Sequence, residues 1–250
     1  MITLSALQLA LLAAGAAAGG AIFGVIGFAY GIVISVFIHH GFAAADVVFI
    51  VVGGALVLNL GMLPKFAKEI RWRAALPYVG GATLGLPIGL WLLATLDART
   101  IRIFVGLLVI AYGAFALRQQ SREPFRVTGA HGTALDTGIG FVGGILGGGS
   151  GLGPLVPGVW FGLRGFSKVE QRALTTPYGL WVQGLMVAWL LAAGLVSREA
   201  IEGLAVATPI MLGASFLGLR LFDRLSTKTF QRAVVILAIV GAIALIGRQL

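Results

Sequence analysis

Ten apolar runs follow one another along the chain, separated by short polar or glycine-rich segments. A helix needs about 20 apolar residues to cross the hydrocarbon core of a bilayer, and most of these runs approach that length. The pattern therefore predicts an all-α polytopic membrane protein with about 8–10 transmembrane segments. The runs cover residues 4–27, 29–42, 45–64, 74–96, 101–118, 133–147, 151–163, 173–196, 199–219 and 230–247.

Three of these runs, residues 29–42, 133–147 and 151–163, are short for a full crossing. The last two flank a tract, residues 147–151, in which four glycines surround Ser150. Each glycine in a helix costs about 1 kcal/mol relative to alanine, so the tract predicts an unwound backbone at membrane depth. Freed N–H groups and the N-terminus of the next helix attract anions. The pattern thus predicts discontinuous, glycine-rich helices with an anion site beside them.

The two halves of the chain resemble each other. An offset of 124 residues places the amide Asn59 on the amide Gln183, and an offset of 129 places Gly89 on Gly218. Amide side chains are rare inside apolar runs, so the first match is the more informative. We expect a single membrane domain over residues 1–250, with repeat 1 at about 1–118, a linker at 119–131 and repeat 2 at about 132–250.

The basic residues of the loops indicate how the halves are oriented, because Lys and Arg mark the cytoplasmic side. Corresponding loops of the two halves carry opposite charge patterns, which predicts an inverted repeat of two homologous halves, each beginning with a hairpin of two segments and with both chain termini outside. The alternative is eight simple spans, which would leave one half in violation of the charge rule. The predicted cytoplasmic loops are 63–73, 118–126, 164–172 and 220–232, and the predicted outer loops are 43–46 and 195–200.

Composition narrows the classes of function. The chain is 58% apolar and 11% charged, which excludes a disordered chain, a coiled coil or a nucleic-acid module. Its net charge of +9 lies in short loops, as topology signals and lipid contacts do. There is no cysteine, no Walker lysine and no His/Glu metal pair at helical spacing. We therefore expect no enzyme activity, no cofactor and no metal, and we expect the first run to be a membrane segment rather than a cleaved signal peptide.

The candidate substrate-binding residues are polar or glycine positions within apolar runs. Several have a structural alternative: close helix packing for the glycines, helix pinning for the amides, and capping or back-bonding for Thr175 and Thr176. Acidic residues only flank the loops, so a carboxylate proton relay is not predicted. The candidates are Tyr30, Ser35, Asn59, Gly148, Gly149, Ser150, Gly151, Thr175, Thr176 and Gln183, with no catalytic residue.

The second half carries a recognisable signature. Residues 138–157 read GIGFVGGILGGGSGLGPLVP, and residues 173–184 read ALTTPYGLWVQG. This arrangement resembles the TauE/SafE sulfite exporter family, also called the toluene sulfonate uptake permease family. The glycine triplet 147–149 with Pro154 or Pro157 matches the element of that family, and Thr175 and Thr176 match its small hydroxyl residues. Residues 24–31 of the first half depart from it, because they lack a glycine triplet and a proline.

The resemblance implies export or uptake of a small sulfur-containing or organic anion without ATP. We expect a secondary transporter, in a bacterial inner membrane, whose broken elements at 27–35 and 147–155 meet near the midplane and alternate between inward- and outward-open states. Its expected partners are the anion, membrane lipids, a coupling proton or ion, and further copies of the chain, but not nucleic acid. The alternatives are an anion channel, a non-transporting membrane assembly subunit and an intramembrane enzyme.

Overall fold

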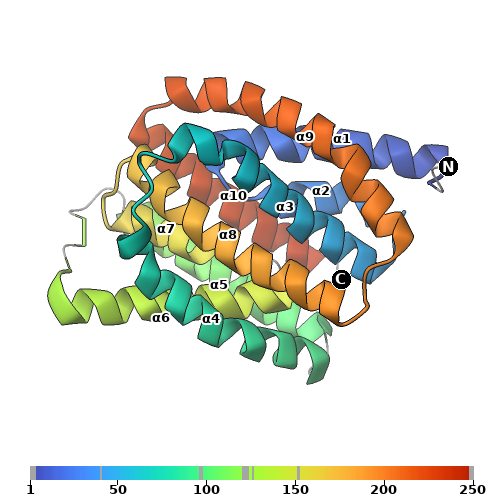
Figure 1. Ribbon diagram of the computed structural model, residues 1–250. Helices are drawn as coiled ribbons and strands as arrows, with labels where there is room; N and C mark the ends of the chain where they lie inside the picture. Colours follow the sequence, from blue (N-terminus) through green and yellow to red (C-terminus); the bar gives the residue numbers. More distant parts are fainter. Residues whose placement is uncertain are drawn as a thin grey trace. The chain divides into compact units, whose positions relative to one another are not determined.

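The computed structural model describes residues 4–39, 41–95, 98–119, 124–125, 127–150 and 153–247. These residues form ten α-helices (Figure 1), so the prediction of an all-α chain is confirmed. The helices are α1 (Ala6–Ile26), α2 (Tyr30–Ile38), α3 (Ala44–Phe66), α4 (Trp72–Thr95), α5 (Ala98–Gln119), α6 (Gly129–Ser150), α7 (Leu155–Leu163), α8 (Lys168–Ala192), α9 (Arg198–Arg224) and α10 (Thr227–Gly247).

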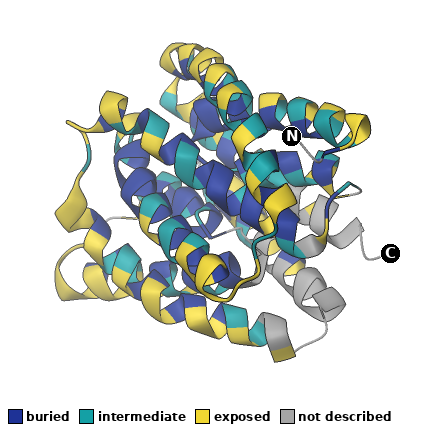
Figure 2. Cartoon of the chain, turned by 45° about the vertical axis from the view of Figure 1, so that its right-hand side comes forward, coloured by how far each residue is buried: buried dark blue, intermediate teal, exposed yellow. Residues whose placement is uncertain are grey.

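Four of the described helices are long and apolar enough to cross a membrane: Ala6–Ile26, Ala45–Phe66, Trp72–Leu92 and Arg198–Arg224. The exposed apolar side chains of α4 recur at helical spacing, as a face toward lipid requires. Figure 2 shows the same division on single helices, which carry buried positions on one side and exposed positions on the other. The exposed large apolar residues of α4 are Trp72, Leu76, Leu84, Ile88 and Trp91.

The helices group into two compact units that do not coincide with the halves of the sequence. Unit 1 comprises Met1–Ala67 and Gly179–Leu225, and unit 2 comprises Lys68–Tyr178 and Ser226–Leu250. Unit 1 therefore holds α1, α2, α3 and α9, whereas unit 2 holds α4 to α7 and α10. The boundary falls inside α8. Each unit thus combines helices from both halves of the chain.

In unit 1, glycines bring the backbones of α1 and α9 into contact. A Cβ atom at Gly20 would collide with the backbone of Met211, and one at Gly24 would collide with the carbonyl of Ser215. The contact is reciprocal, since a Cβ atom at Gly218 of α9 would collide with the carbonyl of Ala21. Small residues at such interfaces replace the hydrophobic driving force that helices lack in lipid.

In unit 2, α4 and α6 pack in the same way over a longer distance. Gly81, Gly85 and Gly89, one helical turn apart on α4, lie directly against the backbone of α6. The glycines of α6 face α4 in return. Their partners are Tyr78 for Gly140, Ala82 for Gly144 and Leu86 for Gly148. The spaced glycines of α4 therefore serve close helix packing.

The first predicted hairpin is present in unit 1. The chain leaves α1 through Gly27 (φ 91°) and Ala29 (φ 74°), both in the left-handed region, and enters α2 at Tyr30. Position 15 of α1 packs on Ile34, and the Gln8 side chain donates a hydrogen bond of 2.7 Å to the carbonyl of Gly41. The nine-residue α2 therefore runs back along α1 and ends beside its start.

The second hairpin, of α6 and α7 in unit 2, corrects one expectation. Helix α6 continues through Ser150, so the predicted unwinding of residues 147–150 is wrong; Gly151 and Leu152 lie outside the described residues. Burial against α4 explains the helix, because Gly144 and Gly148 allow a close backbone contact whose energy outweighs the low helix propensity of glycine. Helix α6 ends at Ser150, and α7 begins at Leu155.

Candidate functional site

The two predicted amides contact each other in unit 1. The side-chain nitrogen of Asn59 donates a 2.9 Å hydrogen bond to the side-chain oxygen of Gln183 and a 3.0 Å bond to the carbonyl of Ala55. Both residues are buried, at 3% and 8% exposure. Gly179, one turn before Gln183, makes room for Asn59, since a Cβ atom there would lie 2.9 Å from the amide nitrogen. The pair joins α3 to α8 with polar groups inside an apolar unit.

Tyr30, at the first helix break, is completely buried, and its hydroxyl has no hydrogen-bond partner among the described residues. Its ring lies between Gly19 of α1 and Gly54 of α3, and a Cβ atom at Gly54 would lie 2.6 Å from the hydroxyl. A buried hydroxyl without a partner is unfavourable, and such a group calls for an explanation such as a ligand or water. Its position after the left-handed Ala29 places it at the start of α2.

The second break in unit 2 also contains a tyrosine, but from another helix. Tyr178 of α8 is buried, and its hydroxyl lies 3.4 Å from the carbonyl of Gly153, to which it donates. A Cβ atom at Gly143 of α6 would lie 2.5 Å from the same hydroxyl. Pro154 precedes the first residue of α7, where the missing N–H of a proline costs little. Here the tyrosine hydroxyl has a hydrogen-bond partner within the described residues.

A buried polar face of α8 is the feature that the sequence interpretation missed. Arg172 was assigned to a cytoplasmic loop, but α8 begins at Lys168 and the Arg172 side chain is only 1% exposed. Thr175 and Thr176, one turn further along, are 4% and 2% exposed. The Thr175 hydroxyl donates to the carbonyl of Gln171 at 2.9 Å, which is the back-bonding alternative. Only the spacing of Arg172 from the two threonines, three and four residues, could have placed them on one face.

A second correction concerns Asp46. The sequence interpretation left this residue in a loop, whereas it lies in the first turn of α3 and is 5% exposed. An acidic side chain in the first turn of a helix interacts favourably with the helix dipole. The carboxylate therefore has a structural reason to be there.

The polar contacts at the mouth of the second hairpin hold α6 and α7 together. The Asp136 carboxylate accepts hydrogen bonds of 2.9 Å from the Trp160 ring nitrogen and from the Arg164 guanidinium. Arg164 also donates to the carbonyl of Val127 at 2.9 Å. The charges of Asp136 and Arg164 compensate each other, so this cluster stabilises the hairpin and is not an anion site.

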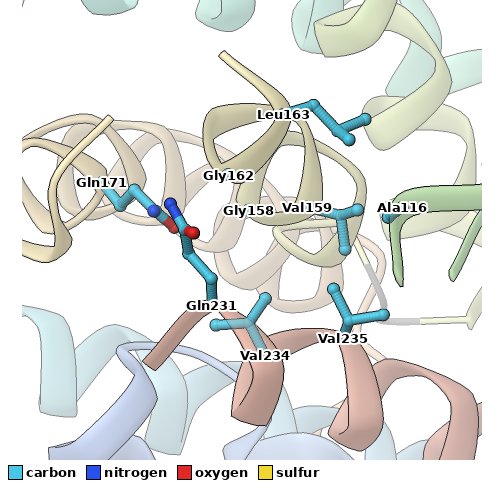
Figure 3. Close-up of a pocket in the computed structure, with 9 residues that line it drawn as sticks. All are labelled: Ala116, Gly158, Val159, Gly162, Leu163, Gln171, Gln231, Val234 and Val235. Carbon is cyan, nitrogen blue, oxygen red and sulfur yellow. The ribbon is translucent and has the colours of Figure 1, made fainter. Parts of the chain in front are cut away.

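Unit 2 also contains a small pocket (Figure 3), walled by α5, α7, α8 and α10. The side chains of Gln171 and Gln231 lie close together at one end of it, and both donate hydrogen bonds to the carbonyl of Phe166, at 2.9 and 3.2 Å. The remaining wall is apolar, with Val159, Val234 and other aliphatic groups. Its volume of about 10 Å³ suits one water molecule and excludes a sulfite-sized anion.

The other predicted site residues differ in their surroundings. The Ser35 hydroxyl donates to the carbonyl of Ile32 at 3.0 Å, and Gly148 packs against α4. Gly149 and Ser150 are described only as the helical end of α6, and Gly151 lies outside the described residues. The structure therefore brings Asn59 to Gln183 and Thr175 beside Thr176. No group of three His, Asp or Glu residues that could hold a metal occurs in the described part of the chain.

The sequence matches a known protein family and a curated protein. The model of the sulfite exporter TauE/SafE family matches residues 11–245. "Probable inner membrane transporter protein TsaS" of Comamonas testosteroni is 28% identical over 201 residues, which cover 77% of this chain and 82% of that protein. No solved structure matches the chain. The matched family consists of transporters rather than enzymes. Because the match extends over nearly all of its length, this integral membrane chain belongs to the TauE/SafE sulfite exporter family of membrane transporters.

Proposed function

We propose that this chain is a secondary transporter that exports a small anion, such as sulfite, an organosulfonate or a related carboxylate, across a bacterial inner membrane. The observation that carries the proposal is the pair of interrupted helical hairpins in a member of the sulfite exporter family. The words "inner membrane" in the name of the relative from C. testosteroni support the proposed location of the chain in that membrane. Lipids surround the chain, and a proton or another ion couples the transport.

The substrate site takes its donors mainly from neutral groups. The amides Asn59 and Gln183, the hydroxyl of Tyr30 and the threonines of α8 are buried and polar in otherwise apolar helices. Neutral donors can stabilise an anion without holding it too tightly for release. The remaining members of the proposed site are Ser35, Gly148, Gly149, Ser150 and Gly151, which lie at or near the two hairpin breaks.

An inverted repeat of two homologous halves, each of five helices, underlies the transport cycle. This repeat is supported by contacts in unit 1 that match contacts in unit 2 when residue numbers are shifted by 124 or 129. The contact of Gly20 with Met211 in unit 1 corresponds to that of Gly144 with Ala82 in unit 2. Two equivalent residues of a two-fold repeat can touch only near its axis, and the hydrogen bond between Asn59 and Gln183 fits that position. Such a repeat permits alternating access by rocking.

Ion pairs support the proposed sidedness. Lys65 contacts Asp223 at 2.8 Å in unit 1, and Arg71 contacts Glu170 at 3.4 Å in unit 2. The backbone N–H of Phe125 donates to the carbonyl of Leu163. Loop 63–73, which the positive-inside rule assigns to the cytoplasm, thus contacts loop 220–232 in unit 1 and loop 164–172 in unit 2, and the same rule assigns these two loops to that side.

The test is counterflow in proteoliposomes. Vesicles preloaded with unlabelled sulfite or sulfoacetate should accelerate the uptake of the labelled anion, with saturation as its concentration rises. Flux that neither saturates nor responds to preloading would favour a channel. Absence of flux for every tested sulfonate, sulfite and short carboxylate, by protein that keeps its thermal transition, would favour a non-transporting assembly subunit.

A further inference from the structure

The described part of the chain buries one Arg side chain almost completely. Arg172 is the largest of the fully buried side chains, with 1% of its surface exposed. It lies in the second turn of α8, near Gln171, Thr175 and Thr176, which are also buried. The other buried polar side chains are Asp46, Asn59, Gln183 and Ser215. Arg172 is therefore the only cation among the buried side chains of the described residues.

A permanent charge at this depth needs a reason beyond packing. A guanidinium stays protonated in proteins, so burial cannot neutralise it as it can neutralise a lysine or a carboxyl. Well-packed apolar residues of similar volume usually serve stability as well as a buried charge or better. Basic residues used as topology signals keep their charge in water or at lipid headgroups, as the 62% exposed side chain of Arg71 does. Arg172 fits neither explanation.

The chemistry of the guanidinium specifies a ligand. Its five N–H donors form a planar fork that matches two oxygens of a carboxylate, sulfonate or sulfite group, and the fork can keep a contact within the protein while it offers donors to a ligand. Thr175 and Thr176 follow at three and four residues, so they lie on the same face of α8. The Thr175 hydroxyl already donates to a backbone carbonyl, so the Thr176 hydroxyl is the candidate for an additional donor on this face.

We propose that the guanidinium of Arg172, on the buried face of α8 with Thr176, is the charge-neutralising group that binds the oxyanion headgroup of the transported substrate. This inference rests on the proposed anion transport. It adds a property that neutral donors do not explain: a site with one fixed positive charge prefers a singly charged anion to a neutral molecule of the same shape. Methanesulfonate and dimethyl sulfone form such a pair.

The experiment compares binding of these two compounds to purified full-length protein by calorimetry, with the thermal transition of each ligand-free variant measured separately. Arg172→Gln should bind methanesulfonate about 10- to 100-fold more weakly than the parent and lose the preference over dimethyl sulfone. Arg172→Lys should keep the preference but bind about 3- to 30-fold more weakly, because an ammonium lacks the fork. Arg71→Gln removes the same charge from an exposed site and should change affinity less than about 2-fold.

Each result decides between the hypotheses. A folded Arg172→Gln protein with parent affinity overturns the inference. If that variant does not fold, Arg172→Lys decides, because parent affinity in the lysine variant would exclude a contact that depends on the guanidinium fork. The proposed function fails separately: the parent itself would then neither bind nor exchange methanesulfonate, sulfite or sulfoacetate. Parent exchange together with unchanged Arg172 variants would leave the transporter assignment standing and remove only the role of Arg172.

Discussion

Each helix break contains a buried tyrosine, but the two tyrosines come from different helices. In unit 1, Tyr30 comes from the break itself and packs on Gly19 and on Gly54 of the third helix. In unit 2, Tyr178 comes from the third helix of the second half and packs on Gly143 of α6. The offset of 124 residues relates Gly19 to Gly143 and also relates Gly54 to Tyr178. A tyrosine therefore lies against a glycine of the first helix of each hairpin, but it comes from α2 in unit 1 and from α8 in unit 2.

The difference lies in what the hydroxyl groups do. The Tyr178 hydroxyl donates to the carbonyl of Gly153, whereas the Tyr30 hydroxyl has no partner among the described residues. The first break also holds Ala29, which has a side chain, in a left-handed conformation that costs such a residue about 1–2 kcal/mol. The tyrosine hydroxyl of the second break thus has a partner, whereas the first break keeps an unsatisfied donor and a strained residue. Functional sites are where such costs are commonly retained.

The largest expected effect tests whether each unit is stabilised by those glycines that contact a neighbouring backbone, rather than by glycines in general. Gly81→Leu places a side chain into the backbone of α6 and should abolish the folded state, since even modest overpacking costs about 1–3 kcal/mol. Gly80→Leu is the matched control, because nothing lies within 4 Å of a Cβ atom at Gly80. The measurement is the yield of monodisperse protein and its thermal transition in detergent.

The same comparison extends to unit 1. Gly24→Leu should be as damaging as Gly81→Leu, because position 24 faces the carbonyl of Ser215, whereas Gly213→Leu on α9 meets nothing within 4 Å. Sensitivity of only one unit would contradict the idea that equivalent glycines carry equivalent contacts.

The next effect concerns the amide pair. Asn59→Leu and Gln183→Leu each leave the partner amide buried without its bond, which costs about 1–3 kcal/mol of stability. The double variant should lose less than the sum, by a coupling energy of about 0.5–1.7 kcal/mol, as measured for hydrogen bonds between membrane helices. Each single variant should also reduce transport more than stability alone explains. Additive losses would mean that the bond contributes nothing, and parent transport in folded variants would leave helix pinning as its role.

A smaller effect separates the two tyrosines directly. Tyr178→Phe removes a hydrogen bond and should lower stability by about 0.5–1 kcal/mol, whereas Tyr30→Phe removes only an unpartnered hydroxyl and should leave stability unchanged or slightly higher. Transport should respond in the opposite order if the Tyr30 hydroxyl binds the substrate. Thermal transitions and counterflow rates of the two variants are the measurements. Unchanged transport by Tyr30→Phe would remove this residue from the site.

The sequence was sufficient for features set by local pattern and insufficient for those set by packing. Helix number and the two breaks follow from hydrophobic run lengths. The importance of Asn59 and Gln183 follows from the rarity of amides within such runs, whereas their mutual hydrogen bond is a finding of the structure. The glycine tract was misread because helix propensity in isolation ignores a neighbour: the backbone of α4 makes a helical Gly148 favourable. Arg172 was misread because positive residues near helix ends are usually topology signals, and only the fold reveals that this one is buried.

The smallest effect compares how the third helix of each half begins. Helix α3 begins at Ala44, and its N-cap residue Ala43 makes no side-chain hydrogen bond. In unit 2, by contrast, the Ser167 backbone N–H and hydroxyl both donate to the Glu170 carboxylate at 3.0 Å. The N–H bond from Ser167 is the main cause that holds the pKa of Glu170 below its ordinary value of 4.5, with a further contribution from Arg71. A lowered folded-state pKa stabilises the protein above pH 4.5, and this stabilisation disappears as the pH falls through the folded-state value.

Glu170→Ala should therefore lose about 0.5 kcal/mol or less at pH 7, because the group is largely solvated, and the loss should vanish in acid. Glu170→Gln retains a capping partner for Ser167 without the charge and should show a smaller loss at pH 7. Thermal transitions of the parent and both variants between pH 7 and pH 4 are the measurement. A Glu170→Ala deficit that persists unchanged at the acidic end would show that the residue contributes packing rather than charge, and the difference between the two helix starts would then not be electrostatic.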